Sequence, residues 1–129
     1  MVKKVLIVDD DRDMLLSLEE GLLKYDETFS IVTAQDGLGA VNQLRDYSIS
    51  LVVTDLKMPR MDGFSLLSHI MEHYPEIPVI IITGYSTLEM ERLAREGGAI
   101  GYIAKPFMID DLAKRIITSL RTEADGGTL

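Results

Sequence analysis

The feature that most constrains this chain is its alternation between short apolar runs and longer segments with helical spacing. The short runs are rich in β-branched residues and span residues 5–8, 29–33, 51–54, 79–82 and 100–104. Runs of this length are typical of strands that are buried on both faces of a sheet. After each run, apolar residues recur every three or four positions, which is the spacing of an amphipathic helix.

Several helix boundaries can be predicted from capping residues. Asp11 and Asp36 are expected to cap the first two helices, because a carboxylate there can accept a hydrogen bond from a backbone N–H of the first turn. The segment 86–89, Ser-Thr-Leu-Glu, matches a capping box, so a helix is expected to begin after Ser86. Gly97 and the glycine after it should end that helix.

Alternating strands and helices predict an α/β fold with one doubly wound, five-stranded parallel sheet and helices on both faces. The strand order 2-1-3-4-5 is expected, because it is the common arrangement that suits a sheet of this size. The predicted domain covers residues 1–121. The polar segment 122–129 contains glycine and is expected to be a flexible tail or the start of a linker.

Net charge, hydropathy and cysteine content exclude several classes of function. The net charge of −8 makes the domain a poor binder of phosphate backbones, so no direct nucleic-acid binding is expected. No apolar run could span a bilayer and no signal peptide is visible, so no membrane association is expected. The chain has no cysteine, which excludes disulfides and thiolate metal sites and fits the reducing cytoplasm, the expected location.

Polar residues stand at the ends of four of the predicted strands. Asp9 and Asp10 follow the first strand, Asp55 the third, Thr83 the fourth and Lys105 the fifth. The carboxyl ends of parallel strands meet at one edge of the sheet, and ligands bind there at the switch point in strand order. We therefore expect these side chains to form one site.

Carboxylates gathered in this way need a cation. At about 4–6 Å apart they repel one another by several kcal/mol per pair. Oxygen ligands favour Mg²⁺ or Ca²⁺ over zinc, and Mg²⁺ keeps coordination positions open for a phosphoryl oxygen. With Lys105 and Thr83 available to hold further oxygens, the residues predict a phosphoryl-transfer site.

Four ordered motifs give the chain a resemblance to the response-regulator receiver domains of two-component signal transduction. The motifs are VLIVDDD, VVTDLKMPRMDG, IIITGYS and GYIAKPF, and the match extends from residue 3 to about residue 121. The resemblance implies a flavodoxin-like fold, which agrees with the topology expected from the strand pattern. It also implies a phosphorylation-activated signalling switch.

The resemblance assigns roles to the residues at the carboxyl edge. Asp55 would be the phosphoacceptor and also a metal ligand. Asp10 would bind Mg²⁺ directly, with Mn²⁺ as a substitute, and Asp9 would bind it through water. The backbone carbonyl of Lys57 would complete the protein ligands, and Lys105 would contact the phosphoryl group.

A switch is implied as well. Thr83 would be drawn toward the phosphoryl group and Tyr102 would rotate inward to fill the vacated space. Lys57 and Tyr85 would affect how long the phosphoryl group lasts. The resemblance also predicts a cis bond between Lys105 and Pro106, although few X-Pro bonds in folded proteins are cis.

The implied partner is a sensor histidine kinase. An output domain or target protein would bind the face formed by the helix after Ser86, the strand at 100–104 and the helix at 109–120. The domain itself would be a monomer or weak homodimer. It would not be an enzyme beyond self-phosphorylation from phosphodonors and slow autodephosphorylation.

Two alternative functions remain open at this point. The first is a Mg²⁺-dependent aspartyl phosphatase, although Lys57 stands where such enzymes usually carry a second carboxylate. The second is a degenerate receiver that acts only as a binding module. His69 and His73 could in principle hold a metal, but no third ligand is apparent and a solvated helix face is expected.

Overall fold

The protein folds around one parallel sheet. The computed structural model describes residues 2–84 and 86–126, with side chains as far as Arg121. These residues form five strands in the order β2-β1-β3-β4-β5, which confirms the predicted class and topology. The strands are β1 (Lys3–Val8), β2 (Phe29–Ala34), β3 (Ile49–Asp55), β4 (Val79–Thr83) and β5 (Gly101–Ala104).

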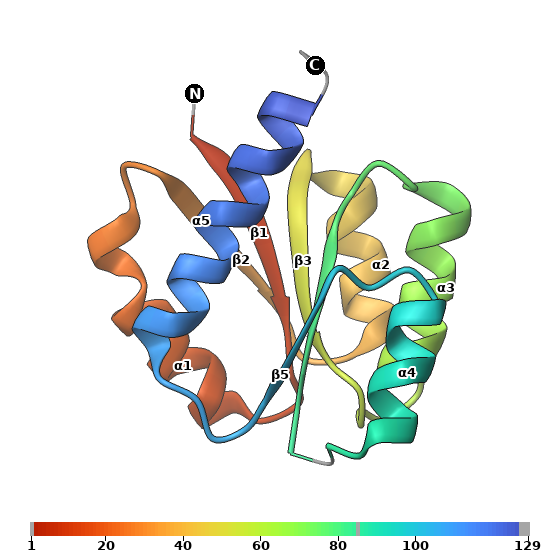
Figure 1. Ribbon diagram of the computed structural model, residues 1–129. Helices are drawn as coiled ribbons and strands as arrows, with labels where there is room; N and C mark the ends of the chain where they lie inside the picture. Colours follow the sequence, from red (N-terminus) through yellow and green to blue (C-terminus); the bar gives the residue numbers. More distant parts are fainter. Residues whose placement is uncertain (1, 85, 127–129) are drawn as a thin grey trace.

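Helices cover both faces of the sheet, α1 and α5 on one and α2, α3 and α4 on the other (Figure 1). The helices are α1 (Arg12–Gly21), α2 (Gly37–Asp46), α3 (Gly63–His73), α4 (Leu88–Glu96) and α5 (Ile109–Gly126). A short 3₁₀ helix, η1 (Leu23–Tyr25), follows α1 and was not predicted. None of the helices in the described part of the chain is long and apolar enough to cross a membrane.

The two helix layers explain the unbroken apolar runs. Along β1, Val5 and Ile7 pack into the core beneath α1 and α5, while Leu6 and Val8 pack into the core beneath α2, α3 and α4. All four side chains are fully buried. A strand between two helix layers buries both of its faces, so its sequence is apolar throughout and does not alternate.

The predicted caps of the first two helices are confirmed. The backbone N–H of Met14 donates to Oδ1 of Asp11, at an N–O distance of 3.2 Å. The N–H of Gly39 donates to Oδ1 of Asp36 at 2.7 Å. Both contacts satisfy a first-turn N–H that has no partner within the helix.

The predicted start of α4 was wrong by one residue. Thr87, not Ser86, caps this helix, and its hydroxyl accepts a hydrogen bond from the N–H of Met90 at 3.0 Å. Serine and threonine are both favoured at N-caps, so two adjacent hydroxyl residues leave the position of the cap open. The end of the helix is as expected, with Gly97 as its C-cap.

At its C-terminus, α5 extends to Gly126, so it includes part of the segment 122–129 that the sequence predicts to be a flexible tail or the start of a linker. The rest of that predicted tail, 127–129, lies outside the described residues. The predicted cis bond between Lys105 and Pro106 is present. The start of β1 and the end of α5 lie on the same side of the molecule, opposite the edge where the predicted site lies (Figure 1).

Candidate phosphoryl-transfer site

The strand ends and the loop after β3 line an open pocket of about 570 Å³ at the carboxyl edge of the sheet. We call it the acidic pocket. It lies beside the switch point between β1 and β3, where doubly wound folds bind ligands. Its lining residues are Asp9, Asp10, Asp11, Asp55, Lys57, Met58, Pro59, Gly84 and Lys105.

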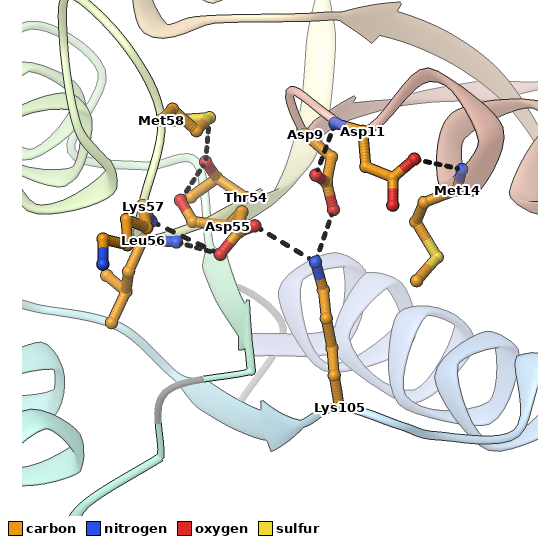
Figure 2. A network of polar contacts seen from close by, with 9 residues as sticks. All are labelled: Asp9, Asp11, Met14, Thr54, Asp55, Leu56, Lys57, Met58 and Lys105. Carbon is orange, nitrogen blue, oxygen red and sulfur yellow. Dashed lines mark hydrogen bonds and ion pairs between the residues drawn. The ribbon is translucent and has the colours of Figure 1, made fainter.

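Lys105 bridges two carboxylates in this pocket (Figure 2). Its Nζ donates to Oδ2 of Asp9 at 2.8 Å and to Oδ2 of Asp55 at 3.1 Å. Asp9 is fully buried, and the Asp55 side chain is 10% exposed. The structure therefore brings together the ends of β1, β3 and β5, as the sequence predicted.

The carboxylate of Asp55 is also held from its own strand end. Its Oδ1 accepts a hydrogen bond from the N–H of Leu56 at 2.7 Å and a longer one from the N–H of Lys57 at 3.4 Å. A backbone N–H donor is already fixed by the fold, whereas a flexible side-chain donor must lose conformational freedom to make the same hydrogen bond. The two N–H groups therefore orient the carboxylate at little cost. Asp55 thus stands at the end of a buried central strand with both oxygens oriented.

Three carboxylates converge closely enough to hold a metal ion. One oxygen from each of Asp9, Asp10 and Asp55 can be chosen so that all lie within 4.8 Å of one another. Asp10 is exposed, whereas Asp9 is buried. Oδ2 of Asp9 accepts from Lys105, and its Oδ1 accepts from the N–H of Asp11 at 3.0 Å. One ammonium cannot neutralise three carboxylates, and an all-oxygen donor set fits a hard divalent cation such as Mg²⁺.

The charge state of Lys105 follows from its surroundings. Burial lowers the pKa of its ammonium group. Hydrogen bonds and charge–charge attraction to Asp9 and Asp55 outweigh burial, and the pKa is raised above its ordinary value of 10.5. Lys105 is therefore a fixed positive charge at neutral pH.

The two predicted switch residues are both buried. Thr83 ends β4 and has no exposed surface, and the pocket is lined at that point by Gly84. Tyr102 on β5 is only 9% exposed and belongs to the core beneath α2, α3 and α4. Within the described part of the chain its hydroxyl group has no hydrogen-bond partner. Tyr85 lies outside the described residues.

Some contacts at the site were not foreseen from the sequence. Thr54, one residue before Asp55, donates its hydroxyl to the Asp55 backbone oxygen at 2.9 Å. Asp36, the cap of α2, accepts a hydrogen bond from Arg60 in the loop that follows β3. No local pattern marks the second contact, because its partners are 24 positions apart.

His69 and His73 lie one turn apart on the same face of α3. The rings of His69 and His73 are tilted, with centroids 4.5 Å apart. Partial burial, followed by the neighbouring charge of His73, lowers the pKa of His69. Among the described residues, the one group of three or more possible metal ligands is the aspartate cluster of the acidic pocket.

Fold and pocket together define a class: a flavodoxin-like α/β domain whose switch point carries an aspartate cluster bridged by a lysine. A comparison with family profiles matches residues 5–117 to the response regulator receiver domain. The chain belongs to this family, whose members are the receiver domains of two-component signalling.

Individual relatives agree with this assignment. The chain is 38% identical over 121 residues to a probable cyclic di-GMP phosphodiesterase of Vibrio cholerae. It is 33% identical over 125 residues to the transcriptional regulatory protein PrrA of Mycobacterium tuberculosis. These matches cover 92% and 97% of this chain but 27% and 53% of the relatives, so the chain spans about half of their length or less.

Solved structures show the same similarity over the whole fold. The CheY-like response regulator receiver domain protein from Methanospirillum hungatei JF-1 superimposes with a TM-score of 0.89 at 29% identity. The match covers 98% of this chain and 99% of that one.

Proposed function

We propose that this receiver domain is a switch that accepts a phosphoryl group on Asp55. The observation that carries the proposal is the bridge from Lys105 to Asp9 and Asp55 within an open acidic pocket. It supports the proposal because a candidate nucleophile, a positively charged lysine and further carboxylates line one space. A phosphoryl-transfer site needs these groups together.

The donor would be a phosphohistidine of a sensor histidine kinase. A carboxylate oxygen of Asp55 forms a bond to phosphorus as the P–N bond of the donor breaks. The leaving imidazole keeps the electron pair and takes a proton from solvent. Lys105 lies where it can bind a phosphoryl oxygen, and the N–H of Leu56 holds the attacking carboxylate in place.

A divalent cation would be held by Asp10 directly, by Asp9 through water, by Asp55 and by the backbone carbonyl of Lys57. When bound, Mg²⁺ or Mn²⁺ would neutralise the charge that builds up between the carboxylate and the phosphoryl group. The chemistry of the three carboxylates supports this proposal, because hard oxygen donors suit these ions.

The output face would be α4, β5 and α5. Large apolar side chains are exposed on or beside these elements, which supports a protein partner at this surface. They are Leu88, Leu93, Ile100 and Met108. The partner is either an output domain or a separate target. The printed names of the relatives, a phosphodiesterase and a transcriptional regulator, indicate how varied outputs can be.

Phosphorylation would reach this face through Thr83 and Tyr102. Thr83 would move toward the phosphoryl group, and Tyr102 would occupy an inward position. In this structure the Tyr102 ring is buried in the core beneath α2, α3 and α4. The proposed change is a shift in population between two states of the domain.

Intact-mass analysis with a small phosphodonor tests the proposed function. One phosphoryl group should be added, only with Mg²⁺ or Mn²⁺ present, and peptide mapping should place it on Asp55. Asp55→Asn should abolish the addition, and Asp10→Ala should abolish or greatly slow it. Lys105→Ala should mainly impair the response, because the nucleophile and metal ligands remain.

The control is Asp13→Asn, which removes an exposed carboxylate in the first turn of α1, outside the acidic pocket. It should be modified like the unaltered protein. Rapid turnover of the donor would indicate a phosphatase, and no modification would indicate a binding module. Addition that persists in Asp55→Asn or in chelator would overturn the assignment of the site.

A further inference from the structure

The loop between β3 and α3 forms one wall of the acidic pocket. It contributes Lys57, Met58 and Pro59 to the lining. The N–H of Gly63 donates to the backbone oxygen of Leu56 at 2.8 Å, which closes the loop at its base. The position of this wall therefore depends on what holds the middle of the loop.

Arg60, in the middle of the loop, has an unfavourable backbone conformation. Its φ angle is 69°, and no other non-glycine residue in the described part of the chain has a positive φ. This left-handed region is disfavoured for residues with a Cβ atom, so it persists where surrounding contacts impose it. The adjacent Met61 N–H donates to the oxygen of Pro59 at 2.8 Å, which fits a sharp reversal there.

Asp36 supplies such a contact from a different part of the fold. Nη1 of Arg60 donates to Oδ2 of Asp36 at 2.7 Å, while Oδ1 of Asp36 caps α2 through the N–H of Gly39. The capping hydrogen bond fixes the Asp36 carboxylate at the start of the helix, and its side chain is 17% exposed, whereas that of Arg60 is 67% exposed.

A second contact joins the same two segments. A Cβ atom placed on Gly37 would lie 2.5 Å from Cβ of Met61 and 2.6 Å from its backbone oxygen. The start of α2 and the loop after β3 are therefore in close contact, in addition to being joined by the ion pair. Because Asp36 is anchored at the start of a helix and Arg60 lies in a loop, the pair can fix the loop relative to the helix.

We propose that Asp36 and Arg60 are positioning residues for the acidic pocket: their ion pair holds the loop in the conformation that places the Lys57 carbonyl and the Pro59 wall. This inference rests on the proposed function, because it names residues that act on the same site. Without the pair, Arg60 relaxes toward the right-handed region and the backbone of Lys57 moves out of position.

Calorimetric measurement of Mg²⁺ affinity distinguishes positioning of the loop from the effect of the changed net charge. Arg60→Met removes a positive charge that repels Mg²⁺, so by charge alone it would strengthen Mg²⁺ binding. Asp36→Asn removes a negative charge but keeps an oxygen that can cap α2, and by charge alone it would weaken binding. Positioning predicts that both variants bind about tenfold more weakly, as is usual for residues that orient metal ligands.

The double variant and a rescue sharpen the test. If the two residues act as one unit, Asp36→Asn combined with Arg60→Met should bind Mg²⁺ about as weakly as either single variant. Arg60→Lys keeps the charge and should recover part of the affinity. Asp62→Asn is the matched control, because Asp62 is an exposed helix cap in the same loop and its carboxylate lies outside the acidic pocket.

Hydrogen exchange in chelator gives a readout that needs no metal and no phosphoryl transfer. The N–H of Met61 should exchange about tenfold faster in Arg60→Met and Asp36→Asn than in the unaltered protein, while core amides stay protected. Opposite effects of the two variants on Mg²⁺ affinity, or unchanged exchange at Met61, would overturn the positioning role. If the unaltered protein binds no Mg²⁺, the proposed function fails, whereas the exchange result still decides whether the pair holds the loop.

Discussion

Gly63 lies so close to Asp55 that a Cβ atom at this position would collide with the Asp55 backbone oxygen. The same Cβ would lie 2.7 Å from Cα of Leu56. The first residue of α3 thus packs directly against the backbone that carries the candidate phosphoacceptor. Only a residue without a side chain permits this approach.

Gly63→Ala should therefore destabilise the fold. The added methyl group meets backbone, which cannot move as a flexible side chain can, and we expect the free energy of unfolding to fall by about 1–3 kcal/mol. Gly84→Ala is the control, because a Cβ at this residue of the pocket lining has nothing within 4 Å. Urea denaturation of both variants checks this, and equal stabilities would contradict the collision.

Lys105→Met should leave Asp9 as a buried, uncompensated charge. We expect the free energy of unfolding in chelator to fall by about 2–3 kcal/mol. Saturating Mg²⁺ should recover part of the loss, and should raise the melting temperature of the variant more than that of the unaltered protein. Thermal denaturation with chelator and with Mg²⁺ measures both effects.

Lys24→Met serves as the comparison. Its ammonium pairs with Asp110 at 2.8 Å, but both side chains are more than half exposed. Water screens such a pair, so this variant should lose far less stability than Lys105→Met and should show no recovery with Mg²⁺. A similar loss in both variants would show that Asp9 does not depend on Lys105.

The raised pKa of Lys105 predicts how stability changes with pH. The group holds its proton more tightly in the folded state, so its contribution is complete below its ordinary pKa of 10.5 and is lost as the pH rises through the folded value. The stability difference between the unaltered protein and Lys105→Met should therefore be constant from about pH 7 to 9 and shrink above about pH 10.5. Urea denaturation across this range tests it, and a difference that grew with pH would have the wrong sign.

Tyr102→Phe should stabilise the protein. The hydroxyl group of Tyr102 is buried and has no partner among the described residues, so its removal relieves a desolvation penalty and keeps the ring. We expect the free energy of unfolding to rise by about 1 kcal/mol. Tyr25→Phe should do the reverse, because the Tyr25 hydroxyl donates to Asp110 at 2.8 Å.

Occupation of the acidic pocket should be detected at the output face. Binding of a phosphate mimic to Asp55 should shift amide NMR signals of residues 88–93 and of Tyr102, in addition to those that line the pocket. Residues 48–50 lie at the opposite end of β3 and should change little. Shifts confined to the pocket lining would rule out the proposed coupling.

The sequence predicted those features that local pattern or strand order determines. Four polar strand ends were expected at one edge, and in the structure Lys105 contacts both Asp9 and Asp55 there. Strand order alone places these ends together, so the prediction did not require knowledge of side-chain packing. The caps at Asp11 and Asp36 are equally local and were also correct.

What the sequence could not predict depends on contacts between distant segments or on choices of nearly equal energy. The Arg60–Asp36 pair joins two loops, and nothing near Arg60 in the sequence indicates its positive φ. Ser86 and Thr87 are both good caps, so the start of α4 was off by one residue. The unpartnered hydroxyl of Tyr102 emerges only from packing in three dimensions.

The bridge from Lys105 to Asp9 also determines when, during synthesis, the buried carboxylate can find its partner. The two residues are 96 positions apart. During synthesis the strand that carries Asp9 leaves the ribosome first, and domains fold as units as their last segments emerge. A nascent chain that ends before β5 has one of its most buried carboxylates without the ammonium group that balances it. The segment that follows the fifth strand therefore supplies the ammonium group that pairs with the carboxylate after the first strand.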